Sequence, residues 1–107
     1  MIDGFEWWSL HDATLERVEL RWHSGEVVLH LRTGVADCPR LQVVGAEARK
    51  VECDRQMPWG FSVSINEVRG PVATLDGRAK RIEIEMQSGD AIVLEARDFV
   101  VCKDEAG

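Results

Sequence analysis

The sequence predicts a mainly β fold, an antiparallel β-sandwich or partly open barrel of about seven or eight short strands, with at most a short N-terminal helical turn. Apolar residues recur at every second position over much of the chain, which is the period of a strand. Polar tetrapeptides containing glycine separate two pairs of these runs, as in hairpins. The segment richest in helix-forming residues, 46–55, has no apolar stripe at helical spacing.

The first element is a hairpin over residues 15–33. The apolar positions on its two strands are Val18, Leu20, Trp22, Val27, Leu29 and Leu31, and "HSGE" connects them. This alternation places Trp22 in the core and His30 on the outward side of its strand.

A second hairpin is predicted near the C-terminus, where "QSGD" connects two alternating runs. Those runs carry Ile82, Ile84 and Met86, then Ile92, Leu94 and Ala96. The two hairpins also align with each other, with Arg17 matching Arg81, Glu19 matching Glu83 and Gly25 matching Gly89. Duplication of one unit and convergence under the same turn constraints both fit this similarity.

The central third predicts strands separated by turns. "RLQVVGA" reads as a strand with Leu41 and Val43 on one face and Gly45 at a bulge or an end. Residues 46–55 are predicted as a strand, although their composition also suits a helix. Residues 60–68 alternate as a strand, and 69–80 read as a loop because Gly70-Pro71 and Asp76-Gly77 are turn signals. Near the start, Ser9 and Asp12 predict a capped helical turn over 9–14.

The tripeptide "PWG" at 58–60 predicts a corner before a strand. Pro58 favours an extended conformation at Met57, and Gly60 permits a sharp turn. Turn chemistry leaves Trp59 unexplained. It either plugs the open end of the sandwich or stands at its mouth as an aromatic contact.

Trp7 and Trp8 are adjacent, so in an extended segment they point to opposite sides and cannot both enter one core. One of them should cover an edge, pack on a partner or line a pocket. The last predicted strand, "DFVVCK", is apolar on both faces, so we expect either the "FEWW" segment or a second copy of the chain to cover it.

Composition bounds the class of protein. A chain of 107 residues with 45% apolar and 30% charged residues fits one soluble domain spanning 1–107. The formal charge of −6 argues against nucleic acid and anionic membrane as partners and leaves a cationic protein or a small neutral or cationic ligand. We expect a protein partner or a homodimer. Three cysteines without a Cys-x-x-Cys pair fit reduced thiols, and the acidic start does not resemble a signal peptide, so we expect a cytoplasmic protein.

Candidate chemistry is sparse. His11 and Asp12 are neighbours, which rarely form a catalytic pair, and a third group for an enzyme would come from Glu95 or His30. Asn66 is expected to end its strand as a turn cap and is also a candidate binding residue, with Trp7, Trp8, His11, Asp12 and Trp59. The sequence therefore predicts no catalytic residue, no metal site and no cofactor.

Three blocks, "LHDATLERVEL", "PWGFSVSIN" and "IEIEMQSGDAIVLEA", resemble a group of small uncharacterised bacterial proteins, some grouped with immunity-type proteins of toxin systems. The resemblance implies a compact β-rich or α+β domain with a protein–protein role, such as masking a toxin's active surface. An acidic charge suits such a role, because complementary fields speed association with a cationic partner.

Three functions are compatible with these features of the sequence. The first is an interaction module, immunity-like or homo-oligomeric, with exposed tryptophans among Trp7, Trp8 and Trp59 as anchors. The second is a small-ligand-binding domain with a pocket near Trp59, His11 and Asp12. The third, ranked last, is an enzyme built on His11 and Asp12.

Overall fold

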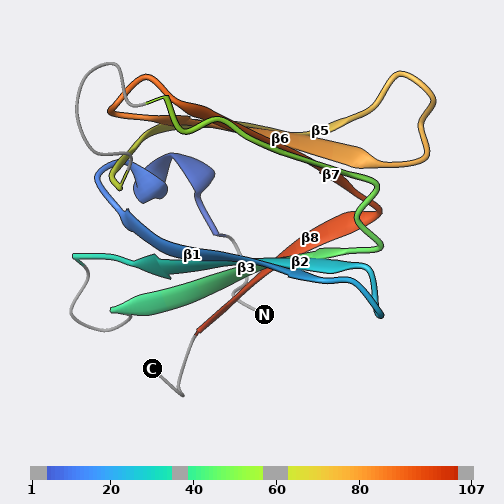
Figure 1. Cartoon of the computed structure of the whole chain (residues 1–107), viewed down its shortest axis with the longest axis horizontal. Helices are drawn as coiled ribbons and strands as arrows, with labels where there is room; N and C mark the ends of the chain where they lie inside the picture. Colours follow the sequence, from blue (N-terminus) through green and yellow to red (C-terminus); the bar gives the residue numbers. More distant parts are fainter. Residues whose placement is uncertain (1–4, 35–38, 57–62, 104–107) are drawn as a thin grey trace.

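The chain forms two four-stranded antiparallel sheets that face each other, which confirms the predicted β-sandwich (Figure 1). The computed structural model describes residues 5–34, 39–56 and 63–103. These residues contain one 3₁₀ turn and eight strands, joined by turns and loops: η1 Trp7–Leu10, β1 Thr14–Arg21, β2 Glu26–Arg32, β3 Arg40–Ala46, β4 Lys50–Cys53, β5 Ile65–Ala73, β6 Lys80–Met86, β7 Ala91–Ala96 and β8 Asp98–Lys103.

The first sheet has the order β1-β2-β3-β8 and the second the order β4-β7-β6-β5. Both predicted hairpins are present, as β1–β2 and β6–β7. Their glycines adopt the positive φ that the turns require, +76° at Gly25 and +96° at Gly89. Each sheet thus contains one of the two similar hairpins.

The core lies between the sheets and is built from alternate residues of each strand. Its fully buried large side chains include Leu29, Leu31, Ile82, Ile84 and Leu94. Leu94 pairs with Ile82 across β7 and β6, and Leu29 lies beside Val43 across β2 and β3. This arrangement is the period-two pattern of the sequence, with the apolar face turned inward.

Gly45 does not mark a bulge but lies one residue before the end of β3 at Ala46, next to the strand end that the prediction allowed. It continues the regular register of β3, opposite Val27 on one side and Phe99 on the other. A Cβ atom at this position would lie 2.9 Å from both Phe99 Cε1 and Val27 Cγ1. Gly45 is therefore a packing requirement, because two core side chains occupy the space that a larger residue would need.

The two sheets are joined at both ends. The chain crosses between sheets from β3 to β4 and from β7 to β8, at the end opposite η1 (Figure 1). There Arg97 N donates to Ala46 O and Arg49 N donates to Glu95 O, both at 2.8 Å. At the other end, Thr14 and Ser64 form an antiparallel bridge between the starts of β1 and β5.

The central segments differ in part from their predictions. Residues 50–53 form a strand, as expected for this region. Strand β5 starts at Ile65 and continues through Gly70-Pro71 to Ala73, so the predicted loop over 69–80 is wrong in its first half. A register shift between Arg69 and Val72 accommodates the Gly-Pro pair, and β5 is an edge strand, where proline is tolerated. The "PWG" corner at 58–60 lies outside the described residues.

The N-terminal turn is shorter and earlier than the predicted 9–14. It spans Trp7–Leu10, and Ser9 lies inside it, with its hydroxyl donating to Glu6 O at 2.6 Å. Leu10 enters the core between the sheets. At the other terminus, β8 is an edge strand as expected, with Phe99 and Val101 buried and Val100 and Cys102 half-buried.

Candidate functional site

Within residues 5–34, 39–56 and 63–103, one side of the sandwich, between the edge strands β1 and β4, is open. Strand alternation turns Val18 and Leu20 of β1, and Val51 and Cys53 of β4, toward the space between the sheets. Val18 and Val51 are half-buried against the core, whereas Leu20 and Cys53 are exposed. Apolar side chains from two facing edge strands therefore border the same opening.

Two pockets lie along this opening. One has a volume of about 350 Å³ and includes Leu15, Val18 and Cys53 in its walls. The other has a volume of about 540 Å³ and includes Leu20, Trp22 and Val51. We name the two together the β1–β4 groove, with its apolar wall formed by Leu15, Val18, Leu20, Trp22, Val51 and Cys53.

Trp22 stands at one end of the groove and is 87% exposed, so its predicted place in the core is wrong. Strand β1 ends at Arg21, and residues 22–25 form the turn, so Trp22 is the first residue beyond the strand. Gly25 N closes the turn by donating to Arg21 O at 2.9 Å. The large indole is thus held next to Leu20, which is itself 46% exposed.

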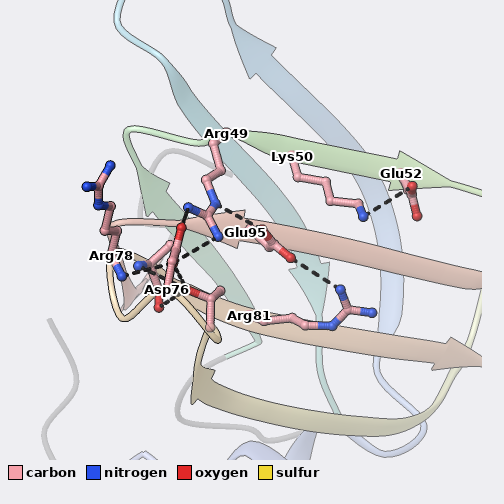
Figure 2. A network of polar contacts seen from close by, with 9 residues as sticks. Arg49, Lys50, Glu52, Asp76, Arg78, Arg81 and Glu95 are labelled. Atoms are coloured by element: carbon pink, nitrogen blue, oxygen red, sulfur yellow. Dashed lines mark hydrogen bonds and ion pairs between the residues drawn. The ribbon is translucent and has the colours of Figure 1, made fainter.

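Arg49 and Lys50 line this end of the groove, and Figure 2 shows the polar contacts around them. Arg49 Nη1 donates to Asp76 Oδ2 at 2.7 Å, and Arg49 Nε donates to Glu95 Oε1 at 2.9 Å. The other oxygen of Glu95 accepts from Arg81 at 3.2 Å. Lys50 lies 3.5 Å from Glu52 along the same strand. These contacts tie β4, β7 and the β5–β6 turn together.

This cluster keeps its carboxylates ionised. Hydrogen bonds from the Arg49 guanidinium, the Thr74 hydroxyl and the Arg78 amide hold the pKa of Asp76 well below its usual range. The Arg49 hydrogen bond also lowers the pKa of Glu95. Because each acid is matched by a cation and neither pKa is raised toward neutrality, the cluster has the properties of a structural clamp and not of a proton-transfer site.

The outer face of β5 and β6 carries an excess of acids. Arg69 lies 2.8 Å from Glu67, 2.7 Å from Glu83 and 3.6 Å from Glu85. Asn66, predicted as a turn cap, instead occupies a register shift near the start of β5, and its amide donates to Glu85 Oε1 at 2.9 Å. Arg69 thus contacts three carboxylates, and Arg81 also lies 3.7 Å from Glu83. We name Glu67, Glu83 and Glu85 the acidic patch.

His11 and Asp12 are exposed and hold the start of β1 in place. His11 Nδ1 lies 3.3 Å from Asp12 Oδ2, and the Gln87 amide donates to Asp12 Oδ1. Asp12 has φ +70°, a conformation that aspartate tolerates, and its backbone N donates to Ile65 O at 2.8 Å. These contacts fix the link between the two sheets, which is the local structural role that neighbouring His and Asp residues usually have.

The two groups suggested as a third catalytic member are engaged elsewhere. Glu95 belongs to the Arg49 cluster on the outer face of one sheet. His30 lies on the outer face of the other sheet, where its Nε2 is 3.0 Å from Glu19 Oε1 and 3.1 Å from Arg17 Nη2. His30 faces outward as predicted and is nevertheless buried beneath these two side chains. The structure does not bring Glu95 or His30 to the His11–Asp12 pair.

The remaining tryptophans behave differently from one another. Trp7 is half-buried against the core, with its ring 5.4 Å from that of Phe5 in an edge-to-face contact. Trp8 is 72% exposed, and its indole N–H donates to Glu6 at 3.1 Å. Only one of the pair therefore packs on the core, as the adjacent positions predicted. Trp59 lies outside the described residues.

Cys53 is the one thiol in the wall of the groove. Although Cys53 is exposed, partial desolvation of its sulfur in the groove wall, with the nearby Asp54 carboxylate as a second cause, raises the pKa of the thiol, so the neutral form dominates at neutral pH. Within the described ranges, no group of three or more His, Cys, Asp or Glu side chains is placed to hold a metal ion. The groove therefore offers apolar contact area in preference to reactive groups.

The chain matches no protein-family model, and no curated protein is similar enough to count as a match. No helix among residues 5–34, 39–56 and 63–103 has the length and apolar character needed to cross a membrane.

Proposed function

We propose that this protein acts by binding another protein chain and that the β1–β4 groove, with Trp22 at its end, is the contact surface. The observation that carries the proposal is the exposure of Trp22, 87%, beside an exposed Leu20 at an apolar groove. Tryptophan is enriched at the centres of protein interfaces because it buries a large apolar area with few rotatable bonds.

The geometry around Trp22 adds to this support. Both walls of the groove are edge strands, and an edge strand is a ready site for pairing with an added strand. The groove is apolar along its length and polar at its rim, where Arg17, Arg49 and Lys50 line its two pockets. An apolar centre with a charged rim is the usual composition of a protein interface.

The test is photo-cross-linking from a photoreactive amino acid placed at position 22. Position 75 is the matched control, because Leu75 is also apolar and fully exposed but lies in the β5–β6 turn, away from the groove. We expect covalent adducts from position 22 and none from position 75. Excess unlabelled protein should suppress the adduct, and excess Trp22→Ser protein should not. Equal adducts from both positions, or none from position 22, would overturn the proposal.

A second candidate is the masking of a cationic partner, as in immunity-type proteins. The net charge of −6 and the acidic patch, where three carboxylates share Arg69, favour it. Binding through this patch should weaken as ionic strength rises, because added salt screens exposed charges. Binding through the groove should depend less on salt, because its contact area is mainly apolar. The salt dependence of partner binding therefore separates the two surfaces.

The alternative of a small-ligand pocket near Trp59, His11 and Asp12 stays a prediction. His11 and Asp12 do not line either pocket of the groove or the third described pocket, of about 490 Å³, beside Arg49 and Asp76. A reducing, cytoplasmic setting is likewise part of this proposal, and it is supported by the unpaired thiols of Cys53 and Cys102.

A further inference from the structure

Among the residues that the structure describes, strand β1 has a free edge over most of its length. On one side it pairs with β2. On the other side, Leu15 N donates to Val63 O at 2.8 Å and Ile65 N donates to Ala13 O at 2.9 Å, so the segment 63–65 covers only the beginning of the strand. From Glu16 to Arg21, no described strand pairs with this edge.

The residues along the free edge are complementary to their own reversed order. The segment reads Val18-Glu19-Leu20-Arg21-Trp22. If two copies pair antiparallel about Leu20, then Leu20 lies opposite Leu20, Glu19 opposite Arg21, and Val18 opposite Trp22. In an antiparallel pair, residues that lie opposite each other share a face, so each of these contacts forms between neighbouring side chains.

On the inner face, this pairing covers the side chains that the monomer leaves exposed. Leu20 and Trp22 face the groove and are 46% and 87% exposed, and Val18 is half-buried beside them. In the pair, the two Leu20 side chains meet at the centre. Each indole lies over Val18 of the other copy, an aromatic–aliphatic cross-strand contact.

On the outer face, the same pairing joins opposite charges. Glu19 Oε2 already accepts from Arg21 Nε of its own chain at 3.0 Å, and both side chains are partly exposed. In the pair, each Glu19 also gains Arg21 of the other copy, so two equivalent ion pairs flank the centre. The charges thus form a continuous alternating row across the junction.

Pairing in a neighbouring register does not place complementary side chains opposite each other on both faces. Pairing centred on Glu19 places Glu19 opposite Glu19 once and Arg17 opposite Arg21 twice, so like charges oppose each other in three contacts. Pairing centred on Val18 places Trp22 opposite Thr14, which already bridges to Ser64. The register centred on Leu20 alone satisfies both faces.

From this complementarity we infer that a second copy of the chain is a partner at the groove, with β1 paired to β1 about a twofold axis at Leu20. This inference rests on the proposed function and deepens it by naming the partner. The resulting dimer is isologous, since the same surface of each copy makes the same contacts. It joins the two β1-β2-β3-β8 sheets edge to edge and removes the free edge of β1 in both copies.

The test is the mass in solution, by light scattering and sedimentation, of the full chain and of two charge reversals. The wild-type chain should have twice the monomer mass of 12.0 kDa. Glu19→Arg alone and Arg21→Glu alone should be monomeric, because each opposes like charges across the axis. Mixing the two variants should restore a dimer, because the arginine introduced at position 19 then faces the glutamate introduced at position 21.

A milder variant tests the dimer contact even if the charge-reversal variants do not fold. Trp22→Ser removes an indole that is 87% exposed in the monomer, so its fold should persist, and we expect its dimer to dissociate at least tenfold more readily. Trp8→Ser, at the other exposed indole, is the control and should leave dimerisation unchanged.

A wild-type mass of 12.0 kDa at every concentration tested would overturn the inference. So would a dimer that is equally stable in the Trp22→Ser variant. If the wild-type chain is monomeric but position 22 cross-links to a different protein, the second-copy inference fails and the proposed function stands. If position 22 cross-links to nothing, both fail.

Discussion

Arg49 and Asp76 lie 27 residues apart in the sequence, yet their side chains meet at 2.7 Å and fasten the β5–β6 turn to the start of β4. Two nitrogens of the guanidinium reach the two oxygens of the carboxylate, at 2.7 and 3.3 Å. A paired geometry of this kind fixes direction as well as distance. The contact holds one end of the second sheet in place.

The Arg49–Asp76 pair predicts a pH-dependent stability. The pKa of Asp76 is lowered on folding, chiefly by the Arg49 hydrogen bond. Its contribution is therefore present above the unfolded-state pKa of about 3.9 and is lost as the pH falls toward the lower folded-state pKa. We expect Asp76→Asn to reduce the free energy of unfolding at pH 7, with a difference from the wild type that shrinks below about pH 4.

Urea unfolding of both proteins across this pH range measures the difference. Asp54→Asn is the matched control, because it removes the same charge from an exposed position at the end of β4. A gap between wild type and Asp76→Asn that is the same at every pH would contradict the assignment.

Gly45 predicts a second effect, on packing. A methyl group at position 45 would lie 2.9 Å from Phe99 Cε1 and from Val27 Cγ1, and 3.1 Å from the Ala96 Cβ. Gly45→Ala should therefore destabilise the protein by about 1–3 kcal/mol, as expected for overpacking. Gly34→Ala meets no atom within 4 Å and should change stability by less than about 0.5 kcal/mol. Chemical denaturation of the two variants compares them directly.

Two leucines give a third prediction, on the core. Leu94 is fully buried between the sheets, whereas Leu75 is fully exposed in the β5–β6 turn. Leu94→Ala should cost about 2–5 kcal/mol, because it removes buried methyl groups and leaves a cavity. Leu75→Ala should stay within about 0.5 kcal/mol of the wild type. Similar losses for both variants in thermal unfolding would mean that the sandwich core is placed incorrectly.

Cys53 gives a fourth prediction, on thiol reactivity. Partial desolvation of its sulfur raises the pKa of the thiol, so little thiolate is present at neutral pH. In a Cys38→Ser, Cys102→Ser variant, alkylation of Cys53 at pH 7 should be slower than that of free cysteine. The rate should rise about tenfold per pH unit up to an apparent pKa above the usual value of about 8.5. An alkylation rate that levels off below pH 8.5 would contradict the raised pKa of the Cys53 thiol.

The hairpins were predictable from the sequence because they depend on local signals. Alternating apolar residues and a glycine in each turn determine β1–β2 and β6–β7, and both are present. Trp22 was placed in the core because it continues the alternation of Val18 and Leu20. The turn begins one residue earlier than "HSGE" suggested, and that single residue moves the indole from the core to the surface.

The course of β5 could not be predicted for a different reason. Gly70-Pro71 is a strong turn signal, but here it occupies a register shift on an edge strand, where a missing N–H leaves no ladder bond unmade. Whether a strand lies at an edge depends on strand order, which no local pattern encodes. Asn66 was misplaced for the same reason, since its partner Glu85 is supplied by β6.

The β1–β4 groove lay beyond sequence reasoning altogether. In the sequence, Val51 and Cys53 are two residues apart, and so are Val18 and Leu20, which is the spacing of one strand face. That these two strands are the outer members of facing sheets follows only from the crossing of the chain between the sheets. The sequence points to Trp7, Trp8, His11 and Asp12 because of their residue types alone. Other residues line the apolar groove of the structure.

The strand order also has a consequence for synthesis on the ribosome. The second edge of β3 pairs only with β8, which comes last among the described strands. Within its sheet, β4 pairs only with β7. The nascent chain must therefore carry β4 unpaired until β7 has left the exit tunnel, and the second edge of β3 unpaired until β8 has left it. We expect the sandwich to close only after both strands have emerged and to do so slowly, because its decisive pairings are distant in the sequence.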